Sequence, residues 1–100
     1  MNAITKVSEI TYLDVAEYLR MTEVTTDDQN TITSLISVAK AFIQGYTGLT
    51  AAQLDDHEDF IIVVYVLCQD MYDNRTLYVD NENLNHVVET ILGMHRVNFL

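Results

Sequence analysis

The sequence predicts an all-α fold: a small bundle of about four helices, two long and two shorter, with no sheet in the core. Apolar residues between positions 32 and 46 recur three and four residues apart, which is the repeat of one face of a helix. The 100 residues include no proline, the residue that interrupts helices. Hydrophobic residues make up 49% of the chain, and no linker composition divides it, so residues 1–100 are expected to form a single domain.

For the N-terminal part, the sequence predicts a loosely ordered leader, residues 1–7, and a first short helix, residues 11–21. Thr11 and Asp14 have the spacing of a capping box at the start of that helix. Its expected inward residues are Tyr12, Val15, Ala16 and Leu19. Residues 22–25 are the expected turn to the next helix.

The segment 26–48 is expected to be the central long helix, about 30 Å in length. Thr26 is the expected N-cap, and Asp27 and Asp28 place negative charge at the positive end of the helix dipole. Gly48 can adopt the left-handed conformation that ends a helix. The inward stripe consists of Ile32, Leu35, Ile36, Ala39, Phe42, Ile43 and Tyr46.

A single turn is expected over 49–54, and the segment 55–75 that follows has conflicting signals. Its β-branched run, Ile61–Val66, favours a strand locally. The segment is nevertheless about twenty residues long without Gly or Pro, whereas buried strands rarely exceed about eight. We therefore predict a helix capped by Asp55 or Asp56, apolar on nearly all sides and the most buried of the bundle.

For the C-terminal part, the sequence predicts a loop over 74–83, anchored by Tyr78 and Val79, and a fourth helix over 82–94. The stripe of that helix consists of Leu84, Val87, Val88, Ile91 and Leu92, and Gly93 interrupts it. An apolar tail, residues 97–100, follows.

The charge is strongly acidic: 15 acidic against 5 basic residues leave a formal net charge of −10. This opposes tight binding of nucleic acid, which depends on Lys and Arg at the phosphates. Most of the acidic residues lie near expected helix starts, where they stabilise the dipole. A surface that repels DNA or binds a basic partner is the alternative interpretation.

No motif predicts catalysis, a cofactor or a metal site. The acidic residues around His57 lack a metal-binding spacing, and His57, His86 and His95 have no recognisable nucleophile partner. Cys68 lies in an apolar run, which raises rather than lowers a thiol pKa. That run, Phe60–Cys68, is far shorter than the roughly twenty residues of a membrane span, so we expect a soluble intracellular protein that is not an enzyme.

The tyrosines have two expected roles. Tyr46, Tyr65 and Tyr72 fall on inward or interfacial faces, where core packing is the favoured role. Possible subunit contacts lie in the loop and the tail, although these side chains could equally pack on their own bundle. They are Tyr78, Val79, Phe99 and Leu100.

Four motifs in a fixed order resemble the head–tail connector (DNA-packaging adaptor) family of tailed bacteriophages. They are a short helix ending EYLRM, an acidic turn TTDD, a long helix ending YTG and an apolar helix ending MYDNR. The closing ILGMHRV is also similar, although Gly93 departs from a helical pattern, and the likeness covers about residues 10–97. The matching positions are Tyr46, Thr47, Gly48, Tyr72 and Arg75, which the resemblance implies are structural signatures.

The resemblance implies a small helical structural protein, made in the host bacterial cytoplasm and located in the virion at the head–tail junction. It would assemble as a ring, either by itself or only once it meets the portal protein, and bind a stopper or tail-completion protein. DNA would pass through the ring without sequence-specific contacts, and no membrane is involved. The alternative is a small acidic regulatory protein or DNA mimic that binds a basic partner.

Overall fold

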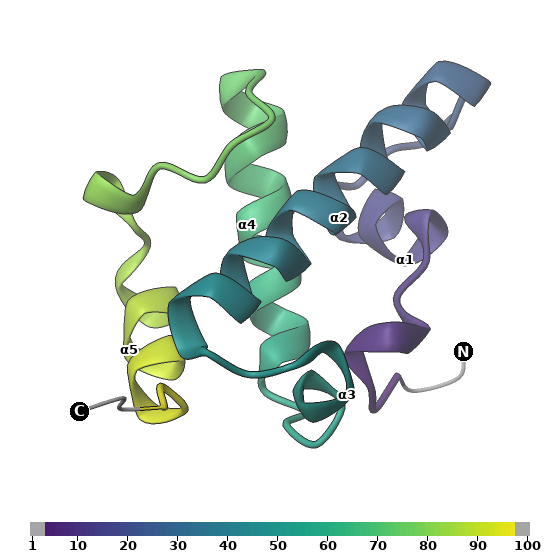
Figure 1. Cartoon of the computed structure of the whole chain (residues 1–100). Coiled ribbons are helices and arrows are strands. Elements are labelled where there is room, and N and C mark those ends of the chain that lie inside the picture. Colours follow the sequence, from purple (N-terminus) through teal and green to yellow (C-terminus); the bar gives the residue numbers. More distant parts are fainter. Residues whose placement is uncertain (1–3, 98–100) are drawn as a thin grey trace.

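The computed structural model describes residues 4–97, and within that range the chain is helical with no strand (Figure 1). The predicted all-α bundle is confirmed, with α2 and α4 long, α1 and α5 shorter, and α3 the expected single turn. In chain order the elements are η1 (Val7–Glu9), α1 (Tyr12–Tyr18), α2 (Thr26–Thr47), α3 (Ala51–Leu54), α4 (Phe60–Asn74), η2 (Asn81–Asn83) and α5 (His86–Met94).

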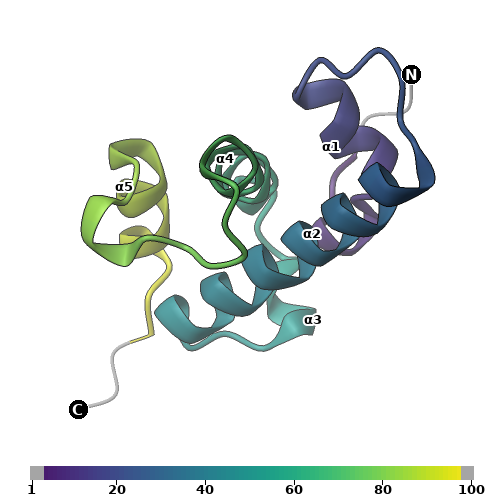
Figure 2. The ribbon, with the colours of Figure 1, turned by 90° about the horizontal axis from the view of Figure 1, so that it is seen from above.

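The two long helices organise the fold. Helix α2 contacts α1, α3, α4 and α5, and α4 contacts α1, α2, α5 and η1. Seen from above, α4 lies between α5 on one side and α1 with α2 on the other (Figure 2). Helices α1, α2 and α5 therefore all contact α4 and together cover its buried residues. No helix in the described part of the chain is long and apolar enough to cross a membrane.

The α2 prediction is confirmed except for its cap. Five residues of the predicted stripe are buried, Ile32, Leu35, Ile36, Ala39 and Ile43, while Phe42 and Tyr46 pack against the core at its edge. The N-cap is Thr25 rather than Thr26. The Thr25 hydroxyl accepts from the Asp28 N–H, and the Asp28 carboxylate accepts from the Thr25 N–H, both at 3.1 Å. Gly48 ends the helix with φ 79°, as predicted.

Helix α4 is a helix as predicted, but it begins at Phe60, so Asp55 and Asp56 do not cap it. Their N–H groups donate to the carbonyls of Ala52 and Gln53 and so close the end of α3. The Asp55 carboxylate accepts instead from the Ser8 N–H at 2.9 Å. The backbone between residues 55 and 59 thus forms turns, and α4 begins only after them.

One edge of α4 faces solvent. The side chains of Ile62 and Tyr72 are 38% and 36% exposed. The six fully covered residues of the helix are Phe60, Val63, Val64, Leu67, Cys68 and Met71. Helix α4 is therefore buried on most sides, but less completely than its apolar sequence predicts.

The short elements correct three further boundaries. Helix α1 ends at Tyr18 rather than at residue 21, because Arg20 adopts a left-handed conformation with φ 62°. The predicted helix 82–94 begins at His86, since the Asn85 side chain accepts from the N–H groups of Val87 and Val88 and caps it there. Residues 81–83 form the separate η2, capped by Asp80.

Two apolar residues at the N-terminal end of the described range pack against the bundle. Val7 is 2% exposed, and Ile4 packs against the core. Both contribute apolar area to the bundle, which favours a fixed position. The loosely ordered leader, residues 1–7, stays a prediction, with Val7 as its anchor in the core.

Candidate functional site

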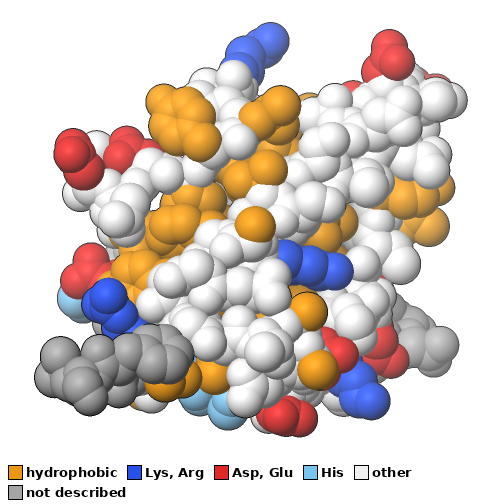
Figure 3. All heavy atoms as spheres, viewed as in Figure 1, with side chains coloured by type: hydrophobic (Ala, Val, Ile, Leu, Met, Phe, Trp, Pro, Cys, Tyr) orange, Lys and Arg blue, Asp and Glu red, His pale blue; other side chains and the backbone are white. Residues whose placement is uncertain are grey.

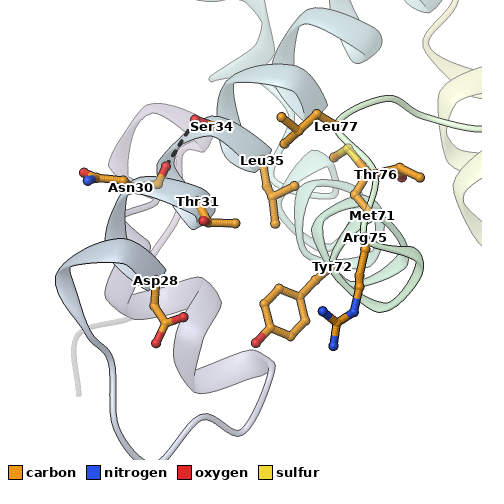
Figure 4. Close-up of a pocket in the computed structure, with 10 residues that line it drawn as sticks. All are labelled: Asp28, Asn30, Thr31, Ser34, Leu35, Met71, Tyr72, Arg75, Thr76 and Leu77. Carbon is orange, nitrogen blue, oxygen red and sulfur yellow. Dashed lines mark hydrogen bonds between the residues drawn. The ribbon is translucent and has the colours of Figure 1, made fainter.

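A groove lies between the N-terminal half of α2 and the C-terminal end of α4, with a volume of about 550 Å³ (Figure 4). The elements that line it, the N-terminal half of α2 and the C-terminal end of α4, lie apart at the upper end of the molecule in Figure 1. Ten residues line it: Asp28, Asn30, Thr31, Ser34 and Leu35 from α2, and Met71, Tyr72, Arg75, Thr76 and Leu77 from α4 and the following loop.

The groove has an apolar floor and an amphipathic edge. Leu35 and Met71 are buried, whereas Tyr72 and Leu77 are 36% and 59% exposed. The side chain of Tyr72 extends into the gap toward Asp28, and Arg75 lies beside Tyr72 (Figure 4). The site thus offers apolar surface with one cation and one carboxylate at its edge, which suits an apolar segment held by a few polar contacts.

Arg75 has a backbone role as well as a place in the groove. It follows α4 with φ 56° and ψ 43°, a left-handed conformation. Its N–H donates to the Tyr72 carbonyl at 3.3 Å, and the Thr76 N–H donates to the Met71 carbonyl at 3.0 Å. This bonding ends the helix and directs Leu77 to the groove edge.

The other three signature positions lie at the opposite end of α2. The Thr47 hydroxyl donates to the Ile43 carbonyl at 2.6 Å and accepts from the Leu49 N–H at 3.2 Å. The Thr47 carbonyl accepts from the Val97 N–H at 2.7 Å, so this helix end holds the chain beyond α5. Gly48 makes the turn. The five signature positions therefore fall into two groups, one at each end of the α2–α4 pair.

The predicted tyrosine roles are divided. Tyr65 is half-buried and stacks on Tyr18 with ring centroids 5.1 Å apart. Tyr46 lies at the core edge near Phe42, with the Arg96 guanidinium 5.1 Å from its ring centroid. Tyr72 lines the groove instead of the core.

The predicted subunit contacts are also divided. Tyr78 is 65% exposed, whereas Val79 packs against the core. Phe99 and Leu100 lie outside the described residues. Sequence reasoning missed Leu77, whose only signal is its place beside Tyr78 in a loop.

Val87 was expected in the buried stripe of its helix but is 55% exposed. Helix α5 is short and buries only Val88 and Leu92. Val87 is one position, or about 100°, away from Val88 around the helix, so it faces away from the core. Met94 lies seven positions later, on nearly the same side of the helix, and is also exposed; Val87 and Met94 form what we call the α5 surface.

Burial shifts the pKa values of two side chains on α4, Cys68 and Asp70. Burial in the apolar core raises the pKa of the Cys68 thiol to about 12, the reverse of nucleophile activation. Burial and the charge of Asp73 raise the pKa of Asp70. No group of three His, Cys, Asp or Glu residues able to hold a metal occurs within residues 4–97.

The described residues thus offer two candidate sites, the groove at one end of the bundle and the α5 surface elsewhere. Comparison of the chain with protein-family models, curated proteins and solved structures found no match.

Proposed function

We propose that this chain is a subunit of the head–tail connector of a tailed bacteriophage, assembling as a ring under the portal. There it would extend the DNA channel and bind a stopper or tail-completion protein. The proposal starts from the order of the EYLRM, TTDD, YTG and MYDNR motifs. The all-α fold with two long helices agrees with what that resemblance implies.

The observation that carries the proposal is the presence of two separate exposed apolar surfaces on a small domain. One comprises Tyr72 and Leu77 at the groove, followed in the chain by the exposed Tyr78, and the other is the α5 surface. Exposed apolar patches mark interaction sites. A ring of identical subunits needs two different surfaces on each copy, because its contacts are heterologous.

The charge supports a passive relation to DNA. A net charge of −10 with five scattered cations opposes phosphate binding, which suits a channel through which DNA slides. Several carboxylates bind backbone N–H groups near helix starts, among them Asp14, Asp28 and Asp80. On the face in Figure 3 the acidic side chains lie at separate edges. This distribution does not favour a DNA mimic, which needs its carboxylates on one face.

Sedimentation velocity and native mass spectrometry of the full chain, alone and with the portal ring of its phage, test the proposal. We expect the chain to co-migrate with the portal in a fixed ratio of chain copies to portal subunits, either one to one or another simple ratio. Val87→Glu should weaken this assembly by placing a charge on the α5 surface. Ile62→Glu, on the exposed edge of α4, is the control. A strict monomer in both conditions would overturn the proposal.

A further inference from the structure

We infer that the tail segment, residues 97–100, inserts its apolar side chains into the groove of a neighbouring copy. The inference rests on the proposed ring and names the two surfaces that join its subunits. The tail segment reads Val-Asn-Phe-Leu, so it offers an aromatic and a branched aliphatic anchor next to each other.

Val97, where the tail segment begins, lies far from the groove of its own chain. The Val97 N–H is bonded to the Thr47 carbonyl at 2.7 Å, at the far end of α2 from the groove. Leu35, the groove residue of α2 nearest that end, is twelve residues away and thus about 18 Å along the helix. Three further residues reach about 10 Å when extended. A second copy must therefore supply the tail segment.

The groove matches such an occupant in size and chemistry. Its volume of about 550 Å³ lies within the range of about 300–1,000 Å³ that encloses small ligands. Leu35 and Met71 form an apolar floor. The exposed side chains of Tyr72 and Leu77 leave apolar area in contact with water, and covering this area would be favourable. Aromatic and aliphatic anchors in such a pocket carry most of the affinity of an interface.

Charge favours this contact over others between two copies. Chains with a net charge of −10 repel each other, but the tail segment carries no charged side chain. The residue before it, Arg96, is exposed beside Tyr46. Joining tail to groove therefore adds no acidic side chain to a groove that already holds Asp28 and Arg75. Added salt should strengthen the association, because it screens the repulsion and leaves apolar contact intact.

Because tail and groove are different surfaces, the contact is heterologous and repeats from copy to copy. This property gives a sharp test. Phe99→Ser removes the tail anchor, and Leu77→Glu places a charge at the groove edge. Leu13→Glu is the matched control, since Leu13 is 58% exposed on α1 and Leu77 is 59% exposed. These exposed groove and control positions leave the core untouched, and circular dichroism checks the fold of each variant.

Sedimentation and amide NMR of the full chain, from micromolar to millimolar concentration, provide the readout. The unmodified chain should show concentration-dependent shifts at the groove residues. Phe99→Ser and Leu77→Glu should each weaken association at least about tenfold, and Leu13→Glu should not. Mixing the Phe99→Ser and Leu77→Glu proteins should give a heterodimer that stops at two subunits, because only one intact tail meets one intact groove.

Three results would overturn the inference. Unchanged association of both variants would place the subunit contact elsewhere while leaving ring assembly and the connector role intact. Failure of the mixed variants to form a heterodimer would exclude tail-to-groove docking, as would the absence of groove shifts at millimolar concentration. Failure of the chain to bind a portal is a separate outcome, which concerns the connector role alone.

Discussion

The Nε2 atom of His95 lies 2.8 Å from the Oδ2 atom of Asp59, joining the end of α5 to the residue before α4. The His95 ring also meets the Phe60 ring edge-on at 4.9 Å and lies 4.1 Å from the His57 ring. Helix α5 is short and buries only two residues. We infer that this contact is a main attachment of α5 at its C-terminal end.

Breaking the His95–Asp59 contact should loosen α5. In a double-mutant cycle, Asp59→Ala and His95→Phe should show a coupling of about 0.5–1 kcal/mol in the free energy of unfolding. His95→Phe keeps a ring against Phe60 and removes the hydrogen bond. Urea denaturation measures the coupling, and a value near zero would contradict the role assigned to the pair.

Thr47→Val tests the hydroxyl at the end of α2. The substitution keeps the shape of the side chain but leaves the Leu49 N–H without its partner, so unfolding should become easier by about 1–2 kcal/mol. Thr33→Val is the matched control, because the exposed Thr33 hydroxyl makes the same type of bond within α2. That variant should change stability by less than about 0.5 kcal/mol. Equal effects at both positions would refute the assignment.

The Asp55 carboxylate makes stability depend on pH at the acidic end. The Ser8 N–H that it accepts holds its pKa below the ordinary value of 3.8. A carboxyl whose pKa is lower in the folded chain stabilises the fold above its unfolded pKa, and this contribution disappears as pH falls through the folded pKa.

Asp55→Asn should therefore lower stability at pH 7 and flatten its decline below about pH 4. Urea midpoints at several pH values measure the difference from the unmodified chain. Asp56→Asn is the control, since the exposed Asp56 carboxylate accepts no hydrogen bond within residues 4–97. An identical acid profile in the Asp55 variant would contradict the prediction.

Cys68 should react with thiol reagents only when the bundle opens. Its side chain is fully buried and its pKa is raised to about 12, so little thiolate exists at pH 8. The rate of reaction with Ellman's reagent should fall as stability rises, tracking the open population. Fast labelling of the folded chain, as rapid as labelling in denaturant, would disprove this placement.

Arg75→Gly separates the backbone role of that position from its side chain. A non-glycine residue in the left-handed region costs about 1–2 kcal/mol, which glycine avoids. Glycine also raises the entropy of the unfolded chain, and this offsets about 0.4–1 kcal/mol of the stability gained. The variant should be more stable by about 0.5–1 kcal/mol, whereas Arg75→Ala should gain nothing. Lower stability of both variants in thermal unfolding would mean that the guanidinium itself supports the fold.

Much of the helical architecture was predictable from local pattern. The stripe from Ile32 to Ile43 identified α2, and length outweighed the β-branched run in α4. The helix starts near residues 55 and 82 were mispredicted, because several polar residues there can cap and only the fold selects among them. The Asp55 carboxylate accepts a hydrogen bond from the N–H of Ser8, 47 positions earlier, and α5 begins after its N-cap Asn85 rather than at Glu82.

The site was far less predictable. Tyr72 and Arg75 were assigned to the fold as structural signatures, but their side chains also line a groove. No local signal indicates that groove, because it exists only where α2 and α4 diverge.

By itself, the sequence determined the helices, the buried stripes and the acidic character, since these depend on periodicity and composition within one segment. Only the tertiary structure decided which apolar residues remain exposed and where the groove opens. The physical reason is that α2 and α4 are separate segments of the chain that meet only in the fold. Their contact covers Leu35 and Met71 and leaves Leu77 and Tyr78 in solvent.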